Sequence, residues 1–283
     1  MKLNHQFTYL LLIGMKRILS SMKAQSRYKL AVSITNIACH YFPFRKEEAK
    51  MNLHQAFPSL SEKRILQILK KTYLFFIHNF IEFIAIPKSW ESIKISVKGE
   101  HLLSSYLNEN KGVVSVTGHF GAWEILGKWL GEYANLFTGV ALHQKNKGFE
   151  KFTLEQRSIP GTKQIFKKEP LEKMYEVLSQ NGLLGLISDQ DAKKKGVFVD
   201  FFGKPASTPK GAALFHINTS APMMLGVCIK RNLDEYEIRL IPVDTSTQNI
   251  TLITQNYTTM LEKIIKEHPE QYFWFHRRWK TRP

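Results

Sequence analysis

The chain has 283 residues, which is enough for one large domain or two small ones and for a substantial core without disulfides or metals. Lysine and arginine number 40 against 24 aspartate and glutamate, so the formal net charge is +16, which predicts an anionic partner such as a membrane surface, an acidic protein or a nucleic acid. Because 43% of the residues are hydrophobic and 12% are aromatic, the composition excludes a disordered basic tail and a collagen-like repeat.

The N-terminus looks like a signal peptide only superficially. An apolar stretch, Phe7–Ile13, follows Lys2, but Lys16 and Arg17 close it and no small-residue cleavage site comes after it. The stretch is also much shorter than the roughly 20 apolar residues that a membrane-spanning helix requires. We therefore expect neither cleavage nor a complete span.

The two cysteines, Cys39 and Cys228, are far apart in the sequence, and neither has a second cysteine nearby. This spacing excludes a disulfide framework and a C-x-x-C metal site. It predicts a reducing compartment, with both thiols as small buried side chains.

Helical patterns with basic flanks dominate the first 86 residues. Apolar residues recur at helical spacing at Leu30, Ile34, Ile37 and Tyr41. A denser pattern from Ile65 to Ile86 is interrupted by polar residues, so it predicts a core or interfacial helix rather than a membrane span. Ordinary core packing explains such helices as well, but the basic flanks and the net charge favour a helical membrane-associating region over residues 1–89.

From about residue 93, short apolar runs alternate with amphipathic segments. Helical patterns at Trp123–Tyr133 and Leu171–Leu178 lie between runs that predict strands at Ile93–Val97, Val113–Thr117, Phe137–Leu142, Leu183–Ile187, Met223–Ile229 and Tyr236–Ile241. The alternation predicts an α/β domain over residues 90–283, with helices on the faces of a sheet. In such sheets, chemistry gathers where the strands end at their carboxyl edges.

The first chemically suggestive segment follows the predicted strand Val113–Thr117 and reads GHFGAWE over residues 118–124. Glycines on both sides of His119 permit a sharp turn, which places the imidazole at the strand tip and Glu124 in the first turn of a helix. A carboxylate bonded to one ring nitrogen would make the other a better base, and the segment has no serine or cysteine, so the histidine would act on a substrate hydroxyl. A core histidine beside a surface glutamate fits the spacing equally well.

This segment resembles the H-x-x-x-x-D/E block of the glycerolipid acyltransferases, and specifically the GHFGNWE form of the late acyltransferases of lipid A biosynthesis, with Ala122 in place of the frequent asparagine. Asn52, Phe57 and Pro58 fit the family's N-terminal helical part. Three further blocks follow in the family's order: Asn146 and Arg157 with Gly161; Asp189-Gln190-Asp191 with the run 196–209; and Pro269-Glu270-Gln271 with the run 274–280. The resemblance therefore covers essentially the whole chain.

The resemblance implies a mixed α/β sheet flanked by helices and an O-acyltransferase, which moves a fatty acyl group from acyl carrier protein to a hydroxyl of an anionic membrane glycolipid, in particular a lipid A precursor. His119 would be the base and Glu124 would orient it. The substrate-binding residues would be Asn146, Arg157, Asp189, Asp191, Arg277 and Arg278. No metal and no cofactor is implied, and the expected location is the cytoplasmic face of the bacterial inner membrane, in peripheral or monotopic form.

Each block also has a reading of its own. Asp189 and Asp191 follow the predicted strand Leu183–Ile187, so one of them could be a second carboxylate near His119. The alternatives are a D-x-D metal site, as in nucleotide-sugar glycosyltransferases, and an aspartate that only turns the chain. The guanidinium of Arg157 suits a phosphate or sugar acid of the acceptor. The lysines at 193–195 suggest a solvated turn or a docking point for acyl carrier protein.

Near the C-terminus, Trp274 and Trp279 alternate with Arg277, Arg278 and Lys280, a mixture that predicts a membrane-interface or anionic headgroup patch. The same mixture could bind single-stranded nucleic acid, but no RNA-binding motif accompanies it, so we expect no nucleic acid partner. Trp123 and Trp129 are expected in the core.

Two alternatives stay open. The first is the same chemistry on another acceptor, such as a lysophospholipid, an aminolipid or a glycosylated phosphatidylinositol, because the catalytic block does not encode the acceptor. The second is a basic protein that binds membranes or nucleic acid without catalysis, which the pairing of His119 with Glu124 disfavours.

Overall fold

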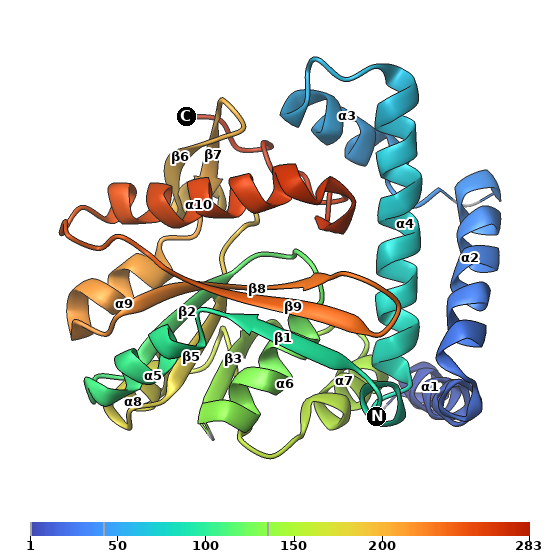
Figure 1. The fold of residues 1–283 in the computed structure, drawn as a ribbon, viewed down its shortest axis with the longest axis horizontal. Coiled ribbons are helices and arrows are strands. Elements are labelled where there is room, and N and C mark those ends of the chain that lie inside the picture. Colours follow the sequence, from blue (N-terminus) through green and yellow to red (C-terminus); the bar gives the residue numbers. More distant parts are fainter. Residues whose placement is uncertain (1, 42, 135) are drawn as a thin grey trace.

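The structure is a computed structural model that describes residues 2–41, 43–134 and 136–283. A seven-stranded sheet crosses the molecule, and helices cover both of its faces (Figure 1). Four helices from the N-terminal part of the described chain lie at one end of this sheet: α1 (Leu3–Ser21), α2 (Ala24–Tyr41), α3 (Lys46–Ala56) and α4 (Glu62–Ile84).

The sheet is mixed. Its strand order is β1 (Lys94–Lys98), β9 (Glu235–Pro242), β8 (Met223–Lys230), β2 (Val113–Thr117), β5 (Leu183–Ile187), β3 (Phe137–Ala141) and β4 (Thr162–Phe166). All neighbours are parallel except β8 and β9, which pair antiparallel. A separate antiparallel hairpin is formed by β6 (Val197–Phe201) and β7 (Lys204–Thr208). The mixed α/β sheet that the resemblance implied is therefore confirmed.

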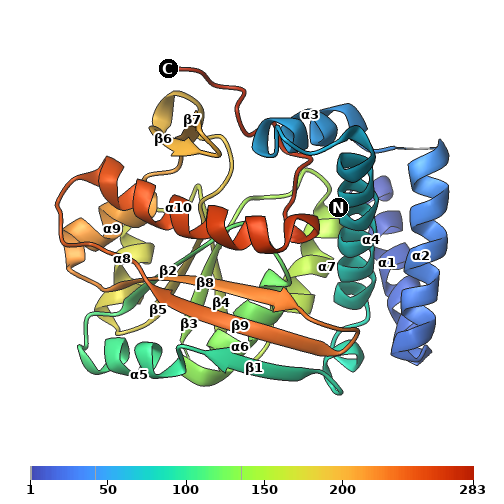
Figure 2. The ribbon, with the colours of Figure 1, turned by 45° about the horizontal axis from the view of Figure 1, so that its top comes forward.

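Helices lie against the two faces of the sheet (Figure 2). Two hydrophobic cores hold them there. On one face, α8 (Glu172–Ser179), α9 (Gly211–Thr219) and α10 (Ile250–Glu267) pack with α3 and α4 in the same core. The other face is covered by α5 (Glu100–Asn108) and α6 (Trp123–Ala134). Because the central strands β2 and β5 are covered on both faces, they read in the sequence as almost unbroken apolar runs.

All six predicted strands occur, with ends that differ by no more than a few residues. Three strands were not predicted: β4, β6 and β7. Strand β4 lies at the edge of the sheet and buries a single residue, Ile165, so it lacks an apolar run. Strands β6 and β7 lie within the run 196–209, which was assigned from the sequence only as part of the family resemblance.

The N-terminal helices are fixed to the rest of the molecule by polar as well as apolar contacts. Arg27 of α2 donates to the Glu82 carboxylate of α4 at 2.9 and 3.0 Å, and both side chains are largely buried. Helix α1 packs along α7 (Lys147–Arg157), where Tyr9 donates to Glu155. Since α3 and α4 share a core with the sheet, the division into residues 1–89 and 90–283 stays a prediction.

The outer face of α1 is apolar. Leucine, phenylalanine and isoleucine side chains that are 52% to 82% exposed recur at helical spacing at Leu3, Phe7, Leu10, Leu11 and Ile18. The helix contains no acidic residue, and Lys16 and Arg17 lie within it. Among the residues that the structure describes, no helix is long and apolar enough to cross a membrane.

Candidate active site

The segment 118–122 turns sharply at the end of β2, as its glycines predicted. Gly121 has a φ of +63°, and a Cβ there would lie 1.9 Å from the carbonyl oxygen of Cys228. The backbone N–H of Gly121 donates to Gln271 and that of Ala122 to Cys228, both at 2.8 Å. The segment is therefore held between the end of β8 and the C-terminal part of the chain, which fixes the position of His119.

Asp189 is the carboxylate that meets His119. Strands β2 and β5 are parallel neighbours with Thr117 opposite Ile187, and the N–H of Ser188 continues the ladder by donating to Thr117 at 2.9 Å. This register brings the residue after Ser188 to the tip of β2. Nδ1 of His119 lies 2.8 Å from Oδ1 of Asp189. The His119 side chain is 27% exposed, whereas that of Asp189 is buried.

The two groups perturb each other's protonation. Burial lowers the pKa of His119, but the neighbouring Asp189 carboxylate more than offsets this, so the pKa of the imidazole lies above its usual value. Burial by itself would raise the pKa of Asp189, and the charge and hydrogen bond of His119, followed by the charge of Arg278, bring it below the usual value. The arrangement stabilises an imidazolium paired with a carboxylate, as a histidine base requires after it accepts a proton.

The expectation that Glu124 orients His119 is wrong. Glu124 accepts from Nη2 of Arg157 at 2.6 Å and from its Nε at 3.0 Å. Helix α6 begins at Trp123, and successive residues of a helix point in different directions. The Trp123 ring packs edge-on against the imidazole, whereas the side chain of Glu124 points to Arg157 of α7. Burial lowers the pKa of Arg157, but the Glu124 carboxylate raises it above its usual value. Glu124 thus anchors Arg157.

A cavity of about 330 Å³ lies beside these residues. Its polar lining residues include Glu124 and Arg157, together with Asn79, Glu82, Gln144 and Thr153. Much of the remaining wall is aromatic: Phe76, Phe80, Phe83, Trp90, Trp123, Phe149, Tyr236 and Phe273. The rings of Trp123 and Phe273 also pack against His119, at centroid distances of 5.6 and 6.1 Å. The lining suits an apolar molecule with a charged or polar end, and two of the lining rings connect the cavity to the histidine.

The other predicted substrate-binding residues do not converge on this cavity. The side chain of Asn146 caps α7 by accepting from the N–H groups of Gly148 and Phe149, and it donates to Thr8. Asp191 accepts from the hydroxyl of Thr281 at 2.9 Å, so the two aspartates of the D-x-D motif do not share one partner. Asn146 and Asp191 therefore have structural contacts instead of open positions in the cavity wall.

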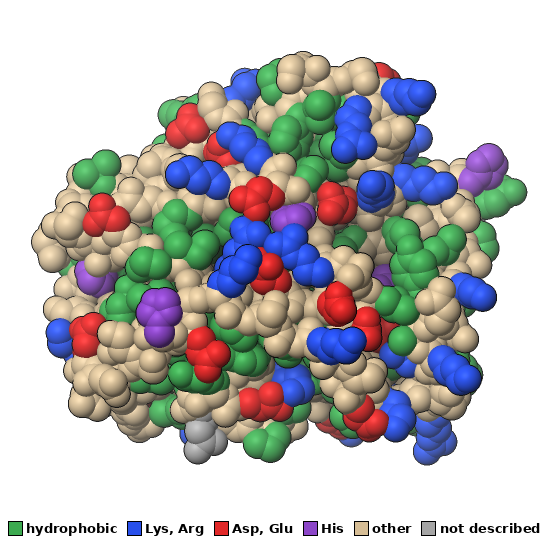
Figure 3. Space-filling model, in the orientation of Figure 1, with side chains coloured by type: hydrophobic (Ala, Val, Ile, Leu, Met, Phe, Trp, Pro, Cys, Tyr) green, Lys and Arg blue, Asp and Glu red, His purple; other side chains and the backbone are tan. Residues whose placement is uncertain are grey.

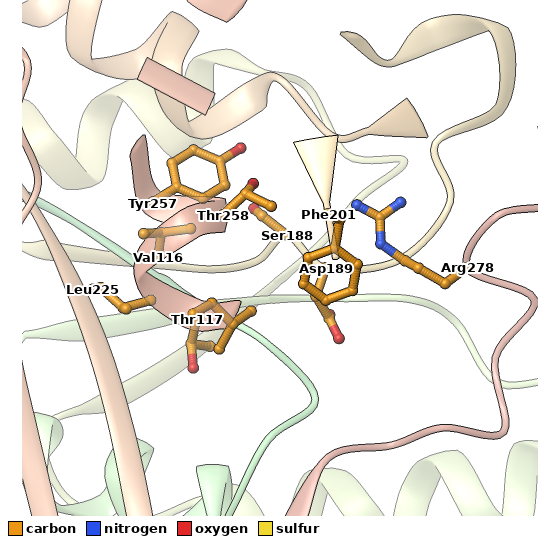
Figure 4. Close-up of a pocket in the computed structure, with 10 residues that line it drawn as sticks. Val116, Thr117, Ser188, Asp189, Phe201, Leu225, Tyr257, Thr258 and Arg278 are labelled. Atoms are coloured by element: carbon orange, nitrogen blue, oxygen red, sulfur yellow. The ribbon is translucent and has the colours of Figure 1, made fainter. Parts of the chain in front are cut away.

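Neither Arg277 nor Arg278 lines the large cavity, and the two differ in exposure. Arg277 is exposed and pairs with Glu48 of α3 at 2.8 Å. Arg278 is buried and lines a second, much smaller cavity together with Asp189 (Figure 4). Trp274, which was expected at a membrane interface, is also buried, because its ring packs on Phe57 and Phe202. Of the residues of the predicted headgroup patch, Trp274 and Arg278 are therefore buried, whereas Arg277 and Lys280 are exposed.

Several residues of the site were not predicted. Trp123, expected in the core, lines the cavity, and Phe273 faces it from the C-terminal segment. Gln190 places its amide nitrogen 3.4 Å from Nε2 of His119. The backbone N–H groups of Gly121 and Ala122 are both used in internal hydrogen bonds, so they do not offer donors to an oxyanion. Only the fold, which joins residues of four distant segments, could show this arrangement.

The fold and the site together define a class: a mixed α/β protein with a histidine–aspartate pair beside a large aromatic cavity, suited to acid–base chemistry on a molecule with a long apolar part. The family model described as bacterial lipid A biosynthesis acyltransferase matches residues 1–281. The chain therefore belongs to this family, which confirms the resemblance found in its sequence.

Known proteins with similar sequences carry two kinds of name. The chain is 29% identical over 185 residues to a phosphatidylinositol mannoside acyltransferase of Mycolicibacterium smegmatis, covering 64% of this chain and 60% of that protein. It is 26% identical over 246 residues to a lipid A biosynthesis acyltransferase of Haemophilus influenzae (83% and 77% covered) and 22% identical over 272 residues to a lipid A biosynthesis lauroyltransferase of Escherichia coli (90% and 86% covered). The match thus spans about 60% of the mycobacterial relative's length.

Among solved structures, the chain is similar to the 1-acyl-sn-glycerophosphate acyltransferase PlsC from Thermotoga maritima. The identity is 12% and the TM-score is 0.39, with 89% of this chain and 100% of that chain covered.

Proposed function

We propose that the protein transfers a fatty acyl group from acyl carrier protein to a hydroxyl of an anionic membrane glycolipid, with a lipid A precursor as the acceptor. The observation that carries this proposal is the hydrogen bond of 2.8 Å between His119 and the buried Asp189, next to a largely aromatic cavity of about 330 Å³ that Arg157 helps to line. The names of the bacterial relatives support the same reaction.

In the proposed reaction, Nε2 of His119 removes the proton of the acceptor hydroxyl while the oxygen attacks the thioester carbonyl carbon. Asp189 accepts a hydrogen bond from Nδ1 and stabilises the imidazolium that forms. The tetrahedral intermediate then collapses to an ester, its C–S bond breaks, and His119 returns the proton to the leaving thiolate. The chain needs no nucleophile of its own, because the acceptor oxygen attacks directly.

Arg157 recognises the anionic part of the acceptor in this proposal. Glu124 occupies Nε and Nη2 of the guanidinium, so Nη1, which lies 3.4 Å from the Gln164 side chain, is the edge that turns to a phosphate. The guanidinium is also 5.8 Å from the centre of the Phe83 ring. The aromatic wall next to it accommodates hydrocarbon chains.

The exposed apolar stripe of α1, defined by Leu3, Phe7, Leu10, Leu11 and Ile18, gives the protein a way to bind a membrane surface. Helix α1 packs on α7, and α7 contributes Phe149, Thr153 and Arg157 to the cavity wall. The stripe and the cavity are therefore carried by adjacent helices, which would let a lipid acceptor reach the site from the bilayer. The stripe supports association with a membrane surface, and we place that surface at the cytoplasmic face of the inner membrane because acyl carrier protein is available there.

A basic turn near the site is the proposed contact for acyl carrier protein, which is acidic. Lys193, Lys194 and Lys195 are exposed and form a short 3-10 helix. Gln190 contacts His119, and three residues of extended chain span at most about 11 Å, so the lysines begin close to the histidine. On the face shown in Figure 3, basic and acidic side chains are interspersed, which does not favour a nucleic acid partner there.

A phosphatidylinositol mannoside is a second candidate acceptor, favoured by the name of the relative with 29% identity. Both acceptors are anionic glycolipids, so the site chemistry is the same and only the acceptor differs.

The test is acyl transfer by the purified protein from acyl carrier protein to vesicles that contain one acceptor each: a lipid A precursor, a phosphatidylinositol mannoside or a lysophospholipid. Mass spectrometry identifies the product. We expect one added acyl chain on the lipid A precursor. Transfer to the mannoside or the lysophospholipid instead would show that the acceptor is that lipid and not a lipid A precursor. Transfer to none of them would refute the proposed function.

A further inference from the structure

Arg278 is a buried arginine with few partners. Only 2% of its surface is exposed. Nη1 donates to the carbonyl oxygen of Ser207 at 2.7 Å, and Nη2 donates to the hydroxyl of Thr208. Its Nε finds no hydrogen-bond partner in the described part of the chain, and the guanidinium lies 5.1 Å from the centre of the Phe201 ring. Two neutral acceptors and one ring are little compensation for a buried positive charge.

Two carboxylates, those of Asp189 and Asp191, act on the charge of Arg278. Asp189 and Arg278 line the same small cavity of about 10 Å³, and Figure 4 shows Arg278 beside Phe201 and Asp189 at one end of it. A space of this size holds no bulk water, so the attraction between the two charges is not screened as it would be at the surface. Consistent with this, burial lowers the pKa of Arg278 while the carboxylate of Asp189 acts in the opposite direction.

We propose that Arg278 is a positioning residue for the His119–Asp189 pair: its buried positive charge keeps Asp189 ionised, so that Asp189 holds the imidazole as a hydrogen-bond acceptor. The catalytic meaning of this inference rests on the function proposed above. The other titratable groups around Asp189 and Arg278 are two tyrosines, a carboxylate and a histidine: Tyr257, Tyr272, Asp191 and His276. Arg278 is the permanent cation among these groups.

The direction of the effect follows from the charges. Without Arg278, an ionised Asp189 in a buried position is less stable, and the pair binds a proton more tightly. The apparent pKa of the His119–Asp189 pair therefore rises when the positive charge is removed. More of the base is then protonated at neutral pH, so activity is lost at pH 7 and recovered at higher pH.

The chain contains a matched control one position away. Arg277 is the same residue type in the same segment, but it is exposed and pairs with Glu48 at 2.8 Å. Arg278→Lys keeps the positive charge and loses the planar fork, which separates the role of the charge from that of the hydrogen bonds.

The experiment is a titration of the His119 ring by nuclear magnetic resonance in the full-length protein, with the signal assigned from its loss in His119→Ala. We expect Arg278→Met to raise the apparent pKa by about one unit, Arg278→Lys to leave it near the wild-type value, and Arg277→Met to leave it unchanged. An unchanged pKa in a folded Arg278→Met variant would overturn the proposal. So would an equal shift in Arg277→Met.

Two further arms keep the outcome decisive. If Arg278→Met does not fold, Thr208→Val removes only the hydroxyl that holds Nη2, and it should raise the pKa of His119 by a smaller amount; no rise would overturn the proposal. The pH profile of kcat/KM for acyl transfer should shift upward with the same variants. Because the titration needs no substrate, a wild-type protein without transferase activity would refute the proposed function while the positioning role of Arg278 is still decided.

Discussion

Asp189→Asn tests the catalytic pair, because it keeps the shape of the side chain and removes its charge. A hydrogen bond to a charged group contributes about 1.5 to 3 kcal/mol, which corresponds to roughly a tenfold to hundredfold change. The asparagine amide can also donate to Nδ1 and so move the proton of the neutral imidazole to Nε2, which would then no longer accept one. Adding the loss of general base catalysis, we expect kcat to fall by at least about a hundredfold.

The pH profile gives this prediction a sign. In the wild type, the Asp189 carboxylate holds the pKa of His119 above its usual value, so kcat/KM falls as the pH drops through that raised pKa. In Asp189→Asn only the effect of burial remains, and burial lowers the pKa of the imidazole. The acid limb should therefore move to lower pH while the plateau falls. A plateau near the wild-type value, or an acid limb that does not move, would refute the role of Asp189.

Glu124→Gln should behave differently, because Glu124 contacts Arg157 and not His119. We expect weaker binding of the acceptor, seen as a raised acceptor KM. The acid limb of the pH profile should stay in its wild-type position. A shift of that limb in Glu124→Gln would restore the original expectation that Glu124 orients the base.

Three further predictions follow from separate parts of the molecule. Arg157→Met should raise the acceptor KM by about tenfold to hundredfold and Arg157→Lys by less, while hydrolysis of the donor without acceptor changes little, as measured across acceptor concentrations. Phe7→Glu with Leu10→Glu should release the protein from anionic vesicles in a sedimentation assay. Lys194→Glu with Lys195→Glu should raise the KM for acyl carrier protein several-fold, and more at low salt than at high salt.

The vesicle-binding and lysine variants each have a control at a comparable exposed position. Leu252 is an exposed leucine on α10, so Leu252→Glu should leave vesicle binding unchanged. Lys111 and Lys163 are exposed near the amino ends of β2 and β4, the edge of the sheet opposite His119, so their reversal to glutamate should not affect the donor KM. An unchanged acceptor KM in Arg157→Met would show that Arg157 serves only to hold Glu124.

The sequence could predict the elements that local patterns encode. The strands β2 and β5 are buried on both faces and therefore appear as apolar runs, and the glycines around His119 mark the turn that the structure contains. The placement of Asp189 at the same edge as His119 also followed from strand order in an α/β sheet. Asn146 was predicted to bind substrate and not to cap a helix, although asparagine before a helix is a common N-cap and the sequence could have indicated this role.

What the sequence could not give is the choice between equivalent partners. Whether Glu124 or Asp189 meets His119 depends on how the segment 118–122 is held by Cys228 and Gln271, which lie more than a hundred residues away. Which of the two adjacent arginines is buried depends on a distant residue, Ser207, whose carbonyl oxygen accepts a hydrogen bond from Arg278 and not from Arg277. Local patterns carry no record of such long-range contacts.

The central claim is that His119 is the base of an acyl transfer to a membrane glycolipid. The most direct measurement is the rate of transfer from acyl carrier protein to a lipid A precursor in vesicles by His119→Ala, relative to the wild type, with vesicle binding measured in the same samples. The account predicts that the rate falls by at least about a hundredfold while the bound fraction stays at the wild-type level. A rate near that of the wild type would contradict it.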